Sequence, residues 1–352
     1  MESRVHVLEH IPIKANLSED EVKQIAWQLY GEKVISVKEL NGYDDKNFHI
    51  KNEEGNEIIM KFINSIDSNN PEIFEAQSLL LVHLKKNGIP CPTPIKTKSG
   101  QYYEKYQLKS GSHIVRALKF MEGIVLAEIT WNNNLFYEIG RSAANMDNAM
   151  ASFQHPAYEN YKSLWMLESV PEILHLLSAV NDSNKQQLIT TIVHEFKEKL
   201  LLCSKNFQRG LIHGDFNEQN IIVDKTDKGQ YEVKAIIDYG DCHIGFYVYE
   251  LAITMTYMIL LAKDIGAGGY VFMGYVSVRP MSKEECSFIK LCIAARLCQS
   301  LVMGAYTNQQ DPTNTYVLIT AVYGWQLLEE LWNEDDENLL QLWNIASNNK
   351  IT

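Results

Sequence analysis

Residues 213–220 read HGDFNEQN, and residues 235–241 read AIIDYGD. The apolar run at 221–223 and the run before Asp238 predict two buried strands of a hairpin. This arrangement would place Asp215, Asn220 and Asp238 on neighbouring loops. Phosphoryl transfer needs such a set, because one carboxylate orients the acceptor hydroxyl while an amide oxygen and a second carboxylate hold Mg²⁺ on the nucleotide. The pattern therefore predicts phosphoryl transfer, in the form His-Gly-Asp-x-x-x-x-Asn and not the His-Arg-Asp form of protein kinases.

Each polar residue of this region has a predicted role. Asp215 is the predicted catalytic residue, which accepts a hydrogen bond from the attacking hydroxyl. Asn220 and Asp238 are the predicted metal ligands, and Asp238 ends an apolar run where an unpaired acid is costly. His213 is expected to hydrogen-bond near Asp238 and to hold the loop. The alternative is an ordinary loop or strand-end acid, which is a weaker explanation for the full set of offsets.

A second group of residues predicts nucleotide binding. Lys61 lies in the apolar run at 58–62, and the helix predicted to follow carries Glu75 one turn from its start. This is typical of a lysine–glutamate pair that grips the α- and β-phosphates. A solvated edge lysine and a surface acid are the alternative. The turn at 41–45 adds Tyr43 and Asp44 as candidate nucleotide contacts, although it has a single glycine.

Three further residues complete the predicted sites. Met121 lies in a predicted hinge whose backbone groups would read the nucleotide base. Asp241 and Glu250 follow the metal aspartate, and either could face a cationic substrate. For Glu250 the alternative is a structural acid that ties its helix to the catalytic loop.

Composition excludes several classes of function. The 352-residue chain has a net charge of −12, which disfavours a nucleic acid or an anionic membrane as partner. The charge suits a small cationic substrate, which we expect to carry a hydroxyl, although solubility is the more common reason for such a charge. The six cysteines form no Cys-x-x-Cys pair, which favours reduced thiols in the cytoplasm. The apolar stretch at 251–262 is too short to span a bilayer and predicts a buried helix. P-loop, zinc-protease and serine-hydrolase motifs do not occur.

The order of predicted elements indicates an α+β fold. A capping box at Ser18 starts a helix that ends at Gly31, and strands are predicted at 33–40, 47–51, 57–63, 101–108 and 113–121. A helix at 71–87 interrupts them, and helical periodicity dominates from Trp131 onward. We expect an N-terminal arm and helix at 1–31, a nucleotide-binding lobe at 32–122, and a catalytic and substrate lobe at 123–352.

The motif at 213–220 resembles that of the aminoglycoside phosphotransferase and choline kinase group. The segment NGYDDKNFH at 41–49, together with 237–241, 247–254 and 296–303, is similar to the hydroxylysine kinase subgroup, so the resemblance covers most of the chain. It implies a bilobal protein-kinase-like fold, with a small N-terminal antiparallel sheet carrying one helix and a larger helical C-terminal lobe.

The same resemblance implies an activity. It implies Mg²⁺ as cofactor and transfer of the γ-phosphate of GTP, or of ATP, to the 5-hydroxyl of hydroxylysine. A kinase for choline, ethanolamine, homoserine or an aminoglycoside is the alternative. A kinase fold without catalysis, used as a binding module, is another, although Asp215, Asn220, Asp238 and Lys61 are all present.

Overall fold

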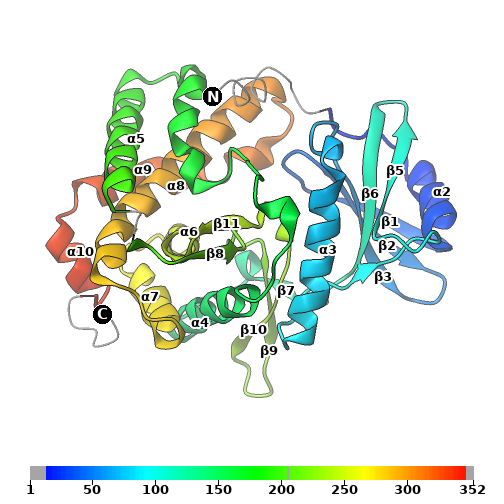
Figure 1. Ribbon diagram of the computed structural model, residues 1–352, viewed down its shortest axis with the longest axis horizontal. Helices are drawn as coiled ribbons and strands as arrows, with labels where there is room; N and C mark the ends of the chain where they lie inside the picture. The colour runs from blue at the N-terminus through cyan, green and yellow to red at the C-terminus, as the bar shows by residue number, and fades with distance from the viewer. Residues whose placement is uncertain (1–12, 204–205, 346–352) are drawn as a thin grey trace. The chain divides into compact units, whose positions relative to one another are not determined.

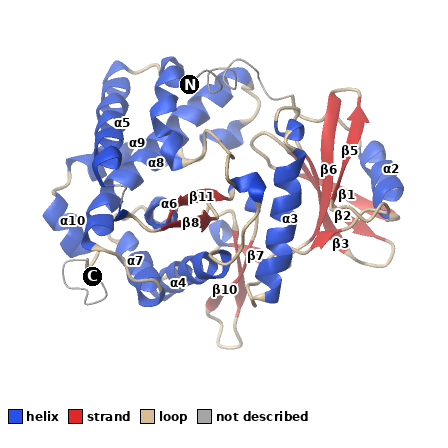
Figure 2. Cartoon of the chain, in the orientation of Figure 1, coloured by secondary structure: helices blue, strands red, loops and turns tan. Residues whose placement is uncertain are grey.

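The computed structural model describes residues 13–203 and 206–345, so residues 1–12 of the predicted N-terminal arm and helix at 1–31 lie outside the described residues. The chain divides into two compact units. The first contains Met1–Lys86 and Cys91–Met121, and the second contains Asn87–Pro90 and Glu122–Thr352. Most strands belong to the first unit and most helices to the second, which confirms the α+β class (Figure 2).

The first unit is an antiparallel sheet with two long helices. Its described strands pair in the order β1-β2-β3-β6-β4, with β5 on β6. The elements are α2 (Glu19–Tyr30), β1 (Val34–Leu40), β2 (Lys46–Asn52), β3 (Glu57–Phe62), η1 (Asp67–Asn69), α3 (Pro71–Lys86), β4 (Pro94–Ile95), β5 (Tyr103–Leu108) and β6 (Gly111–Lys119). Helix α2, expected in a separate N-terminal segment, is part of this unit.

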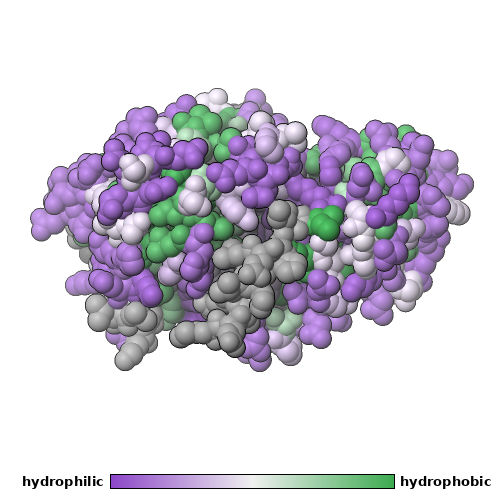
Figure 3. Space-filling model, turned by 90° about the horizontal axis from the view of Figure 1, so that it is seen from above, coloured by the Kyte–Doolittle hydropathy of each residue, from purple (hydrophilic) through white to green (hydrophobic). Residues whose placement is uncertain are grey.

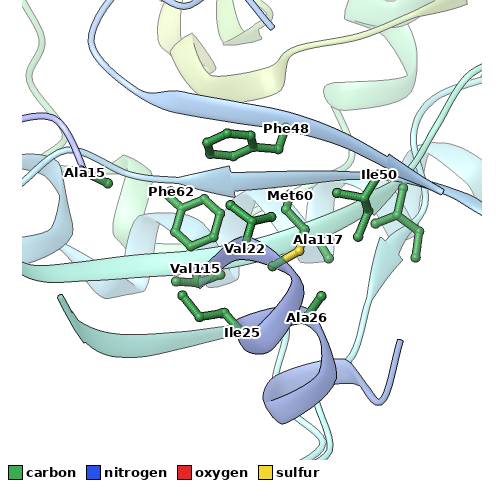
Figure 4. Close-up of a cluster of buried hydrophobic side chains, with 11 residues drawn as sticks. Ala15, Val22, Ile25, Ala26, Phe48, Ile50, Met60, Phe62, Val115 and Ala117 are labelled. Atoms are coloured by element: carbon green, nitrogen blue, oxygen red, sulfur yellow. The ribbon is translucent and has the colours of Figure 1, made fainter. Parts of the chain in front are cut away.

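Helix α2 covers one face of this sheet. Its capping box is formed, since Ser18 Oγ accepts from Glu21 N and Ser18 N donates to Glu21 Oε2. Alternate residues of β3 are buried against it, as the two-residue period of a strand requires. Figure 4 shows the resulting cluster of α2 and sheet residues, which includes Val22, Ile25, Phe48, Ile50, Met60, Phe62 and Val115. Helix α3 lies on the other face (Figure 1).

The second unit is built mainly from helices around three short strand pairings. Strand β9 pairs antiparallel with β10 and β7, and β8 pairs with β11. The elements are β7 (Ile124–Val125), η2 (Leu126–Glu128), α4 (Asn133–Met150), η3 (Pro156–Tyr158), η4 (Leu167–Ala179), α5 (Ser183–Cys203), β8 (Arg209–Ile212), β9 (Ile221–Lys225), β10 (Tyr231–Ile236), η6 (Tyr239–Asp241), β11 (His243–Phe246), α6 (Tyr247–Ala262), α7 (Ala267–Val278), α8 (Lys283–Gln310), η7 (Thr315–Leu318), α9 (Ala321–Asn333) and α10 (Asp336–Leu342).

Glycines allow two of these helices to approach closely. A Cβ on Gly140 of α4 would lie 2.0 Å from Val271 O of α7, and one on Gly274 would lie 1.9 Å from Tyr137 O. No side chain fits at either position, so the two helix backbones touch there. Beside them runs α6, buried along most of its length as the apolar stretch predicted.

Helix α8 is long and apolar enough to cross a membrane, yet 83% of its apolar window is buried inside the fold. It is therefore the core helix of the second unit. On the face seen in Figure 3, hydrophilic residues predominate in both units and apolar residues form separate patches. Most large apolar side chains of the described residues lie inside.

Candidate active site

The loop between β8 and β9 contains the predicted catalytic residues, and its shape requires a glycine. Gly214 has φ +78°, a conformation that favours glycine. A Cβ there would lie 2.8 Å from both Asp241 O and the His243 ring. The backbone of the catalytic loop therefore packs directly on the segment that follows Asp238.

His213 joins these two segments, which confirms its predicted structural role. Its side chain is fully buried, and Nε2 donates to Ile237 O at 3.1 Å. Its Nδ1 accepts from Asp215 N at 3.3 Å, which fixes the tautomer. Burial lowers the pKa of His213, so the ring is neutral at pH 7 and holds the loop without acting as a base.

Three side-chain donors orient the carboxylate of Asp215. Its Oδ1 accepts from Arg296 Nη2 at 2.8 Å, and its Oδ2 accepts from Asn217 Nδ2 and Asn220 Nδ2, each at 2.9 Å. The Asp215 side chain remains 22% exposed. A carboxylate has about four acceptor positions, so a substrate hydroxyl can still donate to it.

The orientation of Asn220 fits its predicted metal role. Its Nδ2 donates to both Asp215 O and Asp215 Oδ2, which leaves the amide oxygen as the remaining polar atom. Within residues 13–203 and 206–345, no hydrogen-bond donor reaches Asn220 Oδ1. A free amide oxygen is a suitable Mg²⁺ ligand.

Asp238 has the left-handed backbone conformation φ 59°, ψ 76°, which is unusual for a residue with a side chain. Ile237 N donates to Asn220 O at 2.9 Å, so the chain just before Asp238 lies beside Asn220. Strain of this kind is concentrated at functional sites. The arrangement brings the two predicted metal ligands onto adjoining segments. Within the described residues, no group of three or more His, Cys, Asp and Glu side chains is arranged to hold a metal ion, so an ion held by this pair would keep several waters.

Glu218 is a further acid of the loop that sequence reasoning did not select. Burial raises its pKa to about 7, and the nearby Asp215 charge adds to the rise. Burial, followed by the charges of Asp215, Glu218 and Asp238, also raises the pKa of Tyr316. The charges of these three carboxylates therefore act on the Tyr316 hydroxyl within the second unit.

Glu250 has the structural role that the sequence left as the alternative. It is 1% exposed, and its Oε2 accepts from Gly214 N at 2.9 Å. This bond ties α6 to the catalytic loop, away from solvent. Asp241 lies in η6, and its backbone oxygen accepts from His243 Nδ1 at 2.7 Å. A substrate contact by the Asp241 carboxylate stays a prediction.

The pKa of Glu250 predicts how the stability of the folded protein depends on pH. Burial raises its pKa from the usual 4.5 to about 7, although bonds from Gly214 and His213 oppose this. The folded protein then holds a proton that the unfolded chain releases, so this contribution to stability is complete below about pH 4.5 and is lost as pH rises to about 7. Glu250→Gln has no proton to lose. We expect the melting temperature of the wild type, relative to this variant, to fall between about pH 5 and pH 7 in thermal scans. Parallel curves would contradict this.

In the first unit, Lys61 belongs to a polar row across the sheet. It pairs in register with Asn47 of β2 and Arg116 of β6, so the three side chains share one face. Arg116 Nη1 donates to Gln77 Oε1 of α3, which identifies this as the face that α3 covers. Glu75, in contrast, is exposed on α3. The pairing of Lys61 with Glu75 stays a prediction.

The turn before β2 carries partly buried acids. Burial raises the pKa of Asp44 to about 7, and the charges of Asp45 and Asp67 add to the rise. Asp45 Oδ1 accepts from Asn64 N at 2.8 Å, which fixes the turn to the segment after β3. Tyr43 is in the same turn, and Met121 follows β6. Their nucleotide contacts, and that of Asp44, stay predictions.

Arg296 is the main residue that sequence reasoning did not assign to the site. It is 2% exposed on α8, and it forms the ion pair with Asp215. One signal was available, because a single arginine in the apolar stretch 291–303 is rarely buried without an anionic partner. The sequence does not indicate which acid that partner is.

Several known proteins are similar to this chain over most of its length. The sequence pattern of the phosphotransferase enzyme family matches residues 36–271 of this chain. A hydroxylysine kinase of Xenopus laevis is 36% identical over 350 residues, covering 94% of each chain. The hydroxylysine kinase of Bos taurus is 31% identical over 352 residues, covering 94% of this chain and 93% of its own. The amicoumacin kinase hAmiN, solved with AMP-PNP, Ca²⁺ and Ami, has a similar fold, with a TM-score of 0.68 at 17% identity and coverage of 96% of this chain and 100% of that chain.

Proposed function

The chain belongs to the phosphotransferase enzyme family, and on this premise we propose that it transfers the γ-phosphate of GTP to the 5-hydroxyl of hydroxylysine. It is a phosphotransferase with an alcohol group as acceptor. The observation that supports hydroxylysine as the acceptor is the 36% identity to a hydroxylysine kinase over 94% of both chains. GTP is proposed from the same resemblance, with ATP as the alternative donor.

The geometry supports a direct transfer. The hydroxyl oxygen forms a bond to the γ-phosphorus while the bond to the β–γ bridging oxygen breaks, and the diphosphate leaves. Asp215 accepts the hydroxyl hydrogen bond and takes the proton. The three donors on its carboxylate fix the direction from which the hydroxyl approaches. Such positioning accounts for much of catalysis in phosphoryl transfer.

Asn220 and Asp238 would hold Mg²⁺ in this enzyme. When bound, the ion neutralises charge on the nucleotide phosphates. The free amide oxygen of Asn220 and the strained backbone of Asp238 support these roles. Lys61 would bind the phosphates, supported by its place in the polar row of the first unit. Tyr43, Asp44, Glu75 and Met121 are proposed as further nucleotide contacts.

The charge of the site supports a cationic acceptor. Asp215 and Glu218 lie on one loop, and Glu218 has a carboxyl whose pKa burial raises to about 7. A substrate ammonium beside it would favour the ionised carboxylate. Hydroxylysine carries an ammonium on the carbon next to its hydroxyl. We also propose a cytoplasmic location, supported by Cys91, Cys286, Cys292 and Cys298, which form no disulfide within the described residues.

The proposal is tested by crossing donors with acceptors. Purified protein with Mg²⁺ is assayed with GTP and ATP against hydroxylysine, lysine, choline, ethanolamine, homoserine and an aminoglycoside. We expect turnover with hydroxylysine and none with lysine, which has the same charges but no hydroxyl. GTP is expected to give the higher kcat/KM. Turnover of choline or homoserine without turnover of hydroxylysine would overturn the proposed acceptor.

A further inference from the structure

We propose that Arg296 is a positioning residue that aligns the Asp215 carboxylate with the acceptor hydroxyl. The two residues are 81 positions apart, and Arg296 lies on the core helix α8. Its Nη2 donates to Asp215 Oδ1 at 2.8 Å. The inference depends on the phosphotransferase reaction and not on the identity of the acceptor.

The guanidinium of Arg296 is held from several sides. Nε donates to Tyr257 Oη at 3.2 Å, and Nη1 donates to Gln299 Oε1 at 3.0 Å and to Trp165 O at 3.3 Å. The rings of Trp165 and Tyr257 lie 5.3 and 5.4 Å from the guanidinium carbon. A planar group bonded and stacked in this way has little freedom to rotate.

Gln299 extends this support by one helical turn. It is fully buried, and its Nε2 donates to Leu164 O at 2.6 Å and to Met166 O at 3.1 Å. The segment at 164–166 is thereby fixed to α8 beside Arg296. The position of Arg296 Nη2 is thus set by α6, by α8 and by the chain before η4, none of which belongs to the catalytic loop.

The charge of Arg296 supports the same role. Burial lowers the pKa of Arg296, but Tyr257 and Asp215 raise it, and the net change is upward. The guanidinium therefore stays charged. It donates to one oxygen of the Asp215 carboxylate, and the side-chain amides of Asn217 and Asn220 donate to the other oxygen. An aspartate held at both oxygens cannot turn away from the acceptor. Misplacement of a reacting group by about 1 Å can lower turnover by about 10²-fold.

The test uses Arg296→Met, Arg296→Lys and Arg296→Ala. We expect Arg296→Met to lower kcat roughly 10- to 100-fold with hydroxylysine, while KM for nucleotide changes by less than about threefold. Arg296→Lys keeps a cation but not the fork of donors, so an intermediate kcat is expected. Adding guanidinium to Arg296→Ala is expected to raise kcat. A residue that only supports the fold would give no such rescue of turnover.

Arg279→Met is the matched control. Arg279 lies in the same unit, bonds to Asn148 and Gln208, and stacks on Tyr247, but it does not contact Asp215. Its removal is expected to leave kcat unchanged in protein that is folded by circular dichroism. An unchanged kcat in folded Arg296→Met would overturn the proposal, and so would equal losses in Arg279→Met or the absence of guanidinium rescue. Wild-type protein is assayed first, because a lack of turnover with hydroxylysine overturns only the proposed acceptor. The variants are then compared on whichever acceptor the wild type phosphorylates.

Discussion

Asp215→Asn is expected to lower turnover by roughly 10²-fold or more while nucleotide affinity stays close to that of the wild type. The amide cannot take the hydroxyl proton and carries no charge to draw the hydroxyl into line. Nucleotide affinity is expected to persist because Asp215 orients the acceptor and is not a proposed ligand of the metal or the phosphates. Steady-state turnover and calorimetric titration with GTP measure the two quantities separately.

The hydrogen bonds around Asp215 predict a second effect of this change. The oxygen of the new amide can still accept from Arg296 Nη2. Its nitrogen would then face Asn217 Nδ2 and Asn220 Nδ2, so that donors meet donors. We therefore expect the melting temperature to fall as well, and activity must be compared in protein that remains folded at the assay temperature.

Asp224→Asn is the matched control for this variant. Asp224 lies on β9 of the same hairpin, is half exposed and pairs with Lys234. Its replacement is expected to leave turnover unchanged. If folded Asp215→Asn turned over hydroxylysine at the wild-type rate, Asp215 would not be the residue that orients the acceptor.

The second large effect is expected for Asp238→Asn, which should lower turnover roughly 10²- to 10³-fold. An amide in place of the carboxylate removes the anionic ligand proposed for Mg²⁺. Asn tolerates the left-handed backbone that Asp238 adopts, so the variant should fold normally. Alanine has no short polar side chain to favour this backbone conformation, so Asp238→Ala should also have a lower melting temperature.

A readout other than activity distinguishes metal binding from other causes. In the wild type, GTP with Mg²⁺ is expected to raise the melting temperature more than GTP alone, because ligands that bind the folded state stabilise it. This additional shift should be lost in Asp238→Asn. An undiminished Mg²⁺-dependent shift would remove Asp238 from the proposed metal site.

Much of the fold could be read from local sequence. The capping box at Ser18, the strand at β3 and the helix that begins at Pro71 all form where their residues predicted them. Each of these elements depends on interactions between residues close in sequence, or on the periodic spacing of apolar residues within one segment. The helix of the predicted N-terminal segment differs, since α2 completes the core of the first unit. That outcome depends on contacts with distant strands.

Helix α3 shows that local sequence does not determine which face of a helix packs against the sheet. The sequence predicted Glu75 as the partner of Lys61, a pairing that stays a prediction, but it did not single out Gln77, which is buried and bonded to Arg116. Two residues along a helix differ by more than half a turn, so the choice depends on which face meets the sheet. The rotation of a helix against its neighbour is set by packing.

The sequence by itself determined the reaction, because the offsets of Asp215, Asn220 and Asp238 are local properties of one hairpin and its loops. Only the tertiary structure decided what surrounds them. Arg296, 81 residues from Asp215, reaches the Asp215 carboxylate because α8 packs through the centre of the second unit. In the same way, Glu250 reaches the loop that contains Gly214 because chain packing places α6 beside that loop. A buried charge must find a partner of opposite sign or a set of donors, but the sequence states only this requirement, and chain packing selects the partner.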